Sequence, residues 1–408
     1  MFYRHASKLV GSTFFAQIAP LLILPILTRN MSQEAFGVYS LFFTSLIMIG
    51  TIAALRYDYA LNSVEKLKQV NSLVFICILL ACVTSVALFF LIIVLVAIGY
   101  LSSIWILLPV SVFLLSLQQT FYQYANNKHN FSLMAKSKVV QAFSTAATQL
   151  LLVYFLGIES GAFWGLAIGY LAVVAYFLLD IKLVRLWTNR DRLRNTLKEF
   201  YSYPTMIFPG TLLNFISGNI PIYLIGFVFG ANVAGNYGLA NRAAGIPTSM
   251  LARSFGEVYR SKALQDLNEL GTFRATFIRV NIVVFVLAIL GFGILFFFTE
   301  EIYRIVFGEG WDNASLFTKL LLPMFFMQFI TTPVSYSLML VGWQSKEFKW
   351  QGLRLLLMTI SMAVAFIFYD TVNAYVIAAS LSMTLSFLVY FYLCVKSAFY
   401  ERLYFENK

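Results

Sequence analysis

One arginine lies deep inside an apolar stretch near the middle of the chain. The segment from Gly235 to Lys262 predicts a membrane-spanning helix, and Arg242 follows soon after the start of its apolar run. At about 1.5 Å per residue, roughly 8 residues place the guanidinium ~12 Å deep, near the middle of a ~30 Å hydrocarbon layer. A charge at that depth costs at least about 2.5 kcal/mol, so it faces protein or water and commonly marks a substrate pathway.

The helix stripe that carries Arg242 is built from small residues. Gly238 lies four residues before Arg242, and Gly245 and Ser249 lie three and seven residues after it, which places all of them on one helix face. Such a stripe leaves room for a ligand to approach the charge. The same stripe is also typical of a helix packing face, on which Arg242 would cap carbonyl groups of a neighbouring helix.

The composition of the whole chain is typical of a membrane protein. The chain has 408 residues, of which 60% are hydrophobic and 12% are charged, with a mean hydropathy of +0.79. Repeated apolar runs of this kind indicate membrane spans. The formal charge of +11 is scattered over short connections, which argues against a nucleic-acid partner.

No side chains suggest a metal, a cofactor or catalysis. Cys77, Cys82 and Cys394 lie inside apolar runs without metal-ligand spacing, and His5 and His129 lie in hydrophilic connections. No nucleotide-binding glycine–lysine motif and no nucleophile triad is visible, so we expect no cofactor and no enzyme activity.

The apolar runs predict an all-α integral membrane protein with twelve transmembrane helices. The first run has no small-residue cleavage site after it, so it is predicted to be a span and not a signal peptide. The expected spans are 8–28, 36–55, 72–99, 101–124, 139–155, 160–179, 203–229, 234–255, 276–298, 314–340, 353–369 and 372–395.

Charge placement supports this count. With a cytoplasmic N-terminus, all but four of the 29 Lys and Arg residues fall on the cytoplasmic side; the exceptions are Arg29, Arg242, Arg304 and Lys319. Seven acidic residues fall on the opposite, outer side of the membrane. This asymmetry follows the positive-inside rule and predicts that both termini are cytoplasmic.

An internal repeat divides the chain into two lobes. The pattern Gly37-x-Tyr39-x-Leu41 recurs 198 residues later as Gly235-x-Tyr237-x-Leu239, on either side of a basic connector. Six spans in each half give a parallel repeat, so we expect two six-helix bundles, 1–198 and 199–408, around a central cavity. Prolines in the lobe-leading spans favour alternating access by kinked helices.

Three runs resemble a known family. PILTRNMSQEAFGVYSLF, LRYDYAL and the run from Tyr203 to Leu251 are similar to the polysaccharide biosynthesis flippases of the Wzx type, which share a superfamily with the lipid II flippase and the multidrug and toxin extrusion antiporters. The resemblance implies a flippase of the bacterial cytoplasmic membrane. Its cargo would be an undecaprenyl-pyrophosphate-linked oligosaccharide for O-antigen or capsule synthesis, and its partners would be membrane lipids and the polysaccharide polymerase machinery.

The resemblance also implies a cationic cavity in which arginines meet the pyrophosphate. Arg242 matches that role by position, and Arg56 with Asp58 match the charged end of the second span. Because these two residues are two apart, we expect no internal ion pair on a helix. For Asp58 we expect interfacial anchoring, with ion coupling as the alternative role.

Sugars need neutral hydrogen-bonding groups and aromatic faces. In the first predicted span the polar candidate is Gln17, and no arginine is present. The absence of an arginine argues against a peptidoglycan precursor as cargo. The candidate lining residues are Gln17, Asn214, Asn219, Asn241 and Gln328, with Tyr223 and Tyr237 for ring faces.

Two other functions compete with the flippase. A multidrug or cation antiporter would need an acid buried in the membrane, and Asp58 and Asp180 lie at span ends. A polysaccharide polymerase or acyltransferase would need a long outer loop with catalytic charges, and the longest outer connection runs only from about Thr299 to Asn313.

Overall fold

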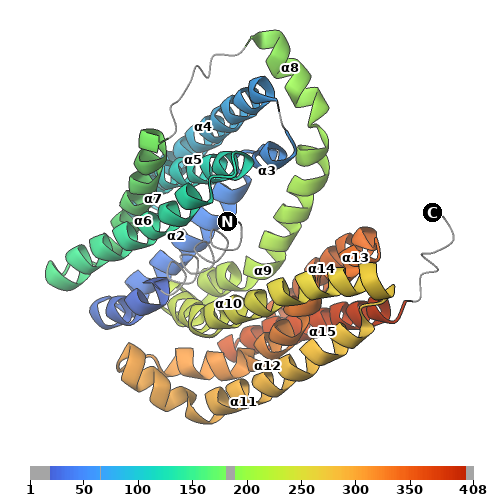
Figure 1. The fold of residues 1–408 in the computed structure, drawn as a ribbon. Helices are drawn as coiled ribbons and strands as arrows, with labels where there is room; N and C mark the ends of the chain where they lie inside the picture. The colour runs from blue at the N-terminus through green and yellow to red at the C-terminus, as the bar shows by residue number, and fades with distance from the viewer. Residues whose placement is uncertain (1–18, 65, 181–188, 401–408) are drawn as a thin grey trace. The chain divides into compact units, whose positions relative to one another are not determined.

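A computed structural model describes residues 19–64, 66–180 and 189–400 (Figure 1). Within these residues every regular element is helical and no strand is present. The chain forms two compact units, Met1–Phe215 and Ile216–Lys408, which are described separately below.

In the first unit, residues 19–30 are helical and precede a series of long helices joined by short turns. The elements are α2 (Gln33–Ile52), α3 (Tyr57–Ala60), η1 (Leu61–Ser63), α4 (Leu67–Ala97), η2 (Ser103–Ile106), α5 (Leu107–Asn127), α6 (Phe131–Gln149), η3 (Leu150–Phe155), α7 (Gly161–Asp180), α8 (Arg190–Glu199) and η4 (Tyr203–Ile207).

Helix α9 (Phe208–Phe229) begins in the first unit and ends in the second. The remaining elements are α10 (Ala231–Leu270), α11 (Arg274–Phe307), α12 (Asp312–Val334), α13 (Ser337–Leu340), α14 (Gln344–Phe368) and α15 (Val372–Ala398).

The long helices fall on the predicted spans. In the described part of the chain, nine helices are long and apolar enough to cross a membrane. Helices α6 and α10 cover two further predicted spans but are more polar, and the first predicted span lies largely outside the described residues. The chain is therefore an all-α multi-pass membrane protein, while the number twelve stays a prediction.

Close packing of α6 against α7 depends on three glycines spaced four residues apart. A Cβ atom added at Gly161, Gly165 or Gly169 would clash with Leu152, Gln149 or Thr145, respectively. This spacing of small residues lets two membrane helices approach closely. The buried Gln149 donates hydrogen bonds to the Tyr39 hydroxyl (3.2 Å) and to the Ala162 carbonyl (2.9 Å).

The two tyrosines of the repeated motif are both buried, with Tyr39 at 4% exposed and Tyr237 at 3% exposed. The motif therefore contributes to packing within each unit. This placement contradicts the expectation that Tyr237 offers a ring face to a sugar.

The second unit has its core between α10, α11 and α12. Ala252, Val284, Ala288, Phe329 and Ile330 form a buried cluster, and aromatic rings pack around it. Apolar side chains that remain exposed follow the outer surfaces of long helices such as α11, as expected for surfaces in contact with lipid acyl chains.

Candidate functional site

The chain makes a turn between α2 and α3 without a glycine or a proline. Leu55 and Arg56 adopt left-handed backbone conformations, with φ of 48° and 63°. Such conformations cost about 1 to 3 kcal/mol for residues other than glycine, so the surrounding structure must enforce them. The Leu55 amide donates to the Ile52 carbonyl (2.8 Å) and the Tyr57 amide donates to the Ala54 carbonyl (3.0 Å).

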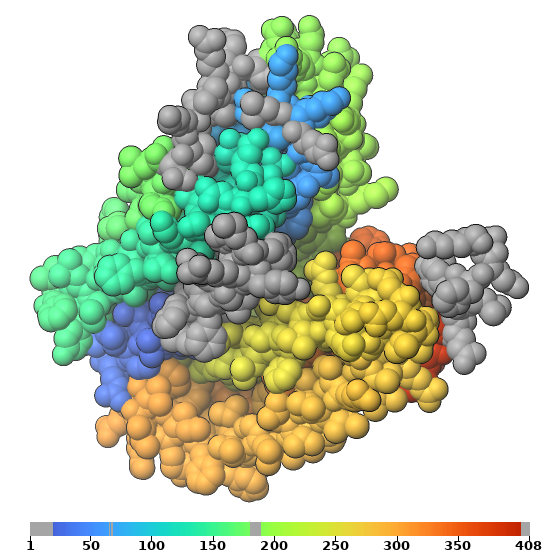
Figure 2. Space-filling model, in the orientation of Figure 1, coloured from blue at the N-terminus to red at the C-terminus, as the bar shows by residue number. Residues whose placement is uncertain are grey.

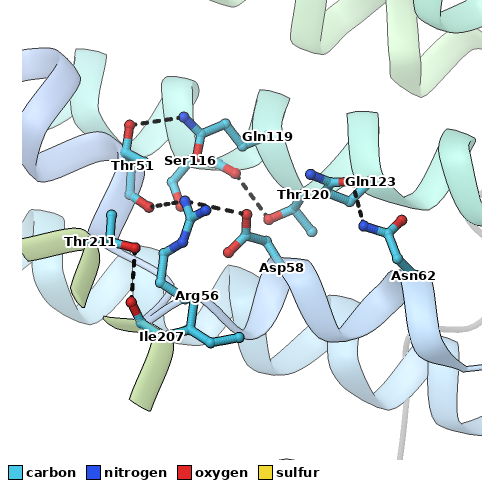
Figure 3. A network of polar contacts seen from close by, with 10 residues as sticks. All are labelled: Thr51, Arg56, Asp58, Asn62, Ser116, Gln119, Thr120, Gln123, Ile207 and Thr211. Carbon is cyan, nitrogen blue, oxygen red and sulfur yellow. Dashed lines mark hydrogen bonds and ion pairs between the residues drawn. The ribbon is translucent and has the colours of Figure 1, made fainter. Parts of the chain in front are cut away.

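This turn directs the Arg56 side chain toward Thr51, near the end of α2, and toward Asp58 on α3 (Figure 3). Its Nη1 donates to the Thr51 carbonyl at 3.3 Å and lies 3.9 Å from Asp58 Oδ2. The guanidinium carbon also lies 3.8 Å from the centre of the Tyr59 ring, in cation–π geometry.

The prediction that Arg56 and Asp58 do not pair is wrong. It assumed a continuous helix, on which residues two apart point to different sides. The left-handed residues at the turn change the direction of the Arg56 side chain and bring the two charges together.

Burial of this pair sets its chemistry. Arg56 is 5% exposed and Asp58 is 2% exposed, so Asp58 is not the interfacial anchor that we expected. Burial raises the pKa of Asp58 to about 6, against the opposing attraction of Arg56. Arg56 Nε and Asp58 Oδ1 have no hydrogen-bond partner among the described residues. Asp58 can therefore bind and release a proton near pH 6.

A series of polar side chains continues from the pair along α5 (Figure 3). Gln119 donates to the Thr51 hydroxyl at 3.1 Å. Further along, Asn62 donates to the Gln123 side chain and accepts from Asn126, both at 2.9 Å.

Arg242 lies on α10 in the second unit and is half-buried, as is its neighbour Asn241. Helix α10 packs against α12, which carries the half-buried Gln328. A Cβ at Gly245 would lie 3.1 Å from the Phe325 ring of α12, and Gly238 is buried. At these two positions the small stripe serves helix packing, as the alternative interpretation held.

The other predicted lining residues are spread over several elements. On α9, Asn214 is exposed, whereas Asn219 and Tyr223 are half-buried. Gln17 lies outside the described residues.

Arg354, within the long helix α14, is a further arginine that the sequence interpretation missed. Its Nε donates to Met383 Sδ at 3.2 Å, and a Cβ at Gly218 of α9 would lie 3.3 Å from its Nη2. The predicted span began at Leu353, which placed Arg354 at a membrane boundary. Helix α14 begins at Gln344 instead, so Arg354 lies about 15 Å along it.

The described residues contain no cluster of His, Cys, Asp and Glu that could hold a metal ion. Their polar sites are instead a buried carboxylate–guanidinium pair in one unit and arginines on α10 and α14 in the other. The first suits a proton or a small cation, and the second suits an anionic group.

Solved structures of similar fold are membrane transporters. The lipid II flippase MurJ in an inward closed conformation has 16% identity and a TM-score of 0.75, covering 96% of this chain and 89% of that chain. An inward-facing multidrug resistance MATE family transporter of the MOP superfamily has 12% identity and a TM-score of 0.68, covering 93% of both chains. A MOP superfamily transporter from Pyrococcus furiosus has 13% identity and a TM-score of 0.55, covering 96% of this chain and 95% of that chain.

At these identities the likeness establishes the fold. No curated protein sequence matches the chain. The family model described as polysaccharide biosynthesis protein matches residues 2–259, more than half of the chain. The chain is therefore a member of the polysaccharide biosynthesis protein family, with the fold of the MOP superfamily transporters.

Proposed function

We propose that this protein is a flippase that moves an undecaprenyl-pyrophosphate-linked oligosaccharide across the bacterial cytoplasmic membrane during O-antigen or capsule synthesis. The observation that carries the proposal is Arg242, a half-buried cation within the long helix α10 of a polysaccharide biosynthesis family member. The predicted central path between two lobes and the cytoplasmic location of both termini belong to this proposal.

Arginine suits the head group of such a cargo. A pyrophosphate presents several acceptor oxygens, and a planar guanidinium can engage two of them at once. In a low-dielectric surrounding this interaction is much stronger than in water. Arg242 thus supplies the attraction that holds the head group inside the membrane, and Arg56 is a second proposed contact to the head group, at the end of the second predicted span.

The sugar portion needs neutral partners. Asn241 and Gln328 lie on two helices that pack together and are both half-buried, which suits weak contacts to hydroxyl groups. Asn214, Asn219 and Gln17 complete the proposed lining. The other partners in this proposal are the membrane lipids and the polysaccharide polymerase machinery that receives the product.

Substitution of Arg242 tests the proposal. We expect Arg242→Ala to abolish surface glycan production in a flippase-deficient strain, and Arg242→Lys to retain only part of it, because lysine lacks the bidentate geometry. Arg253→Ala removes an exposed arginine from the same helix and is the matched control. Normal glycan production by both Arg242 variants, at wild-type protein levels, would rule out the proposed site.

A cation antiporter is the second candidate, and one observation favours it. Asp58 is a buried carboxylate whose pKa lies near 6, as proton exchange requires. The same residue can couple proton movement to flipping. Proton-dependent efflux of an organic cation by reconstituted protein, lost in Asp58→Asn, would support the antiporter over the flippase.

A further inference from the structure

The first unit contains a cavity, lined by residues with polar or charged side chains, that has no role in the function proposed above. It has a volume of about 610 Å³ and lies between the beginning of α4 and helix α8. In Figure 2 the light-blue atoms near the start of α4 and the light-green atoms near α8 share one end of the surface. The cavity is lined by Lys66, Lys68, Gln69, Ser72, Arg192, Asn195, Thr196 and Glu199.

One face of α8 forms a wall of this cavity. Arg192, Asn195, Thr196 and Glu199 follow the three- and four-residue spacing of a single helix face. Across the cavity, α4 contributes side chains from its first two turns. Part of the predicted basic connector is thus a helix, and those of its polar residues that line the cavity lie on one face.

Several contacts hold α8 in place. The Gln69 amide donates to both oxygens of the Glu199 carboxylate, at 3.1 and 2.9 Å. Thr196 is 4% exposed, and the Tyr57 hydroxyl donates to the Leu197 carbonyl at 3.4 Å. The cavity is therefore a packed feature of the unit and not a gap between unconnected segments.

The charge around the cavity is positive. Lys66, Lys68 and Arg192 are exposed, and none of the three makes an ion pair within the described residues. Among the described residues that line the cavity, the one carboxylate is Glu199, and it already accepts two hydrogen bonds from Gln69. The free cationic groups outnumber the acid, which selects for an anion.

The position of the cavity indicates where that anion comes from. Lys68 begins a helix that is long and apolar enough to cross a membrane, and the charged start of such a helix is expected at the level where lipid head groups meet water. Lysine and arginine at such a boundary attract anionic lipids. We propose that this cavity binds the phosphate of an anionic phospholipid from the leaflet at which α4 begins.

Lipid binding to the full-length purified protein tests this assignment. Native mass spectrometry would compare phosphatidylglycerol, phosphatidylcholine, undecaprenyl pyrophosphate and inorganic phosphate as probes. The test variant is K66Q/K68Q/R192Q. The matched control is R190Q/R194Q/K198Q, which removes the same charge from the same region outside the cavity lining.

We expect the protein to prefer phosphatidylglycerol over phosphatidylcholine. The lining variant should lose that affinity by at least about tenfold, and the control variant should lose much less. Equal losses in both variants, or no preference between the two phospholipids, would overturn the proposal. Binding of undecaprenyl pyrophosphate or inorganic phosphate at the lining residues without phosphatidylglycerol binding would overturn the choice of ligand.

Folding of the variants is checked in the same samples. Glutamine keeps the helix propensity of lysine and arginine, so the thermal midpoint should remain within a few degrees of the wild type. If the triple variant does not fold, K66Q/R192Q serves in its place, compared with R190Q/K198Q. Unchanged phosphatidylglycerol binding by that double variant would equally refute the site.

Discussion

At Asp58, the loss of hydration outweighs the attraction of a neighbouring cation. The carboxyl group lies 3.9 Å from Arg56, yet its pKa is raised from 3.8 to about 6 because it is almost fully buried. The folded state therefore holds this proton more tightly than the unfolded state does. Stability contributed by Asp58 is highest below about pH 4 and falls as the pH rises through about 6.

Asp58→Asn should remove this pH dependence. A shift from 3.8 to about 6 corresponds to about 3 kcal/mol of stability in total, which is lost as the pH rises from well below 3.8 to well above 6. Thermal unfolding of wild type and variant in detergent, measured between about pH 4 and pH 7, should show a smaller decline for the variant. Asp191→Asn removes an exposed acid from α8 and should leave the profile unchanged. Parallel profiles for Asp58→Asn and wild type would contradict the raised pKa.

Sequence patterns located the charged residues but not all of their contacts. Arg242 and Arg56 were identified because an arginine within or beside an apolar run is costly and therefore conspicuous. The pairing of Arg56 with Asp58 could not be predicted, because no glycine or proline indicates the left-handed turn at Leu55 and Arg56. Arg354 was missed since the helix continues beyond the apolar run that defined the span.

Close contact between α6 and α7 depends on the absence of side chains at the three α7 glycines. Gly169 faces Thr145 so closely that a Cβ atom could be added only if the Thr145 side chain or its helix shifted. In lipid, such van der Waals packing replaces the hydrophobic driving force that operates in water. The pair should therefore be sensitive to a single methyl group.

Gly169→Ala should lower the stability of the first unit by about 1 to 3 kcal/mol, the usual cost of overpacking. Gly291→Ala on α11 is the matched control, because no atom lies within 4 Å of the added Cβ. Thermal unfolding of both variants measures the difference, and the control should equal or slightly exceed the wild type. A Gly169→Ala variant as stable as the control would show that the two helices can separate without cost.

Helix positions were the most predictable feature at this scale. Apolar runs identified nearly all the long helices, because a membrane-spanning segment must satisfy its backbone internally and bury apolar side chains in lipid. Helix ends were less predictable, because helix geometry continues past the membrane boundary at α10 and α14. The connector charges were recognised, but the helical order of α8, which depends on contacts with Gln69 and Tyr57, was not.

At the scale of the whole molecule, the charge asymmetry predicts which segments face the cytoplasm and which face outward. Glu309 lies in an exposed turn that should face outward, whereas Asn189 and Ser345 lie in exposed segments that should face the cytoplasm. The natural cysteines Cys77, Cys82 and Cys394 must first be replaced. A membrane-impermeable thiol reagent applied to intact cells should then label Glu309→Cys but neither Asn189→Cys nor Ser345→Cys.

Labelling after the membrane is opened provides the control, since all three cysteines should then react. Labelling of Asn189→Cys in intact cells would contradict the cytoplasmic location of the connector. It would also remove the positive-inside argument on which the predicted topology rests.

The proposed cargo also determines how transport should respond to voltage. A pyrophosphate head group carries about two negative charges, so a potential that is negative inside favours its outward movement by roughly 4.6 kcal/mol per 100 mV. In proteoliposomes, imposing such a potential with a potassium gradient and valinomycin should therefore accelerate flipping of a pyrophosphate-linked lipid from the inner leaflet.

Asp58 separates this driving force from proton coupling. If voltage alone drives transport, Asp58→Asn should respond to the imposed potential as the wild type does, and a pH gradient should add little. If Asp58 exchanges a proton for each cargo molecule, the variant should lose the response to a pH gradient while it keeps part of the response to voltage. Flipping of this lipid that is insensitive to the potential in both proteins would show that its charge is compensated during transport, which would exclude the membrane potential as the driving force.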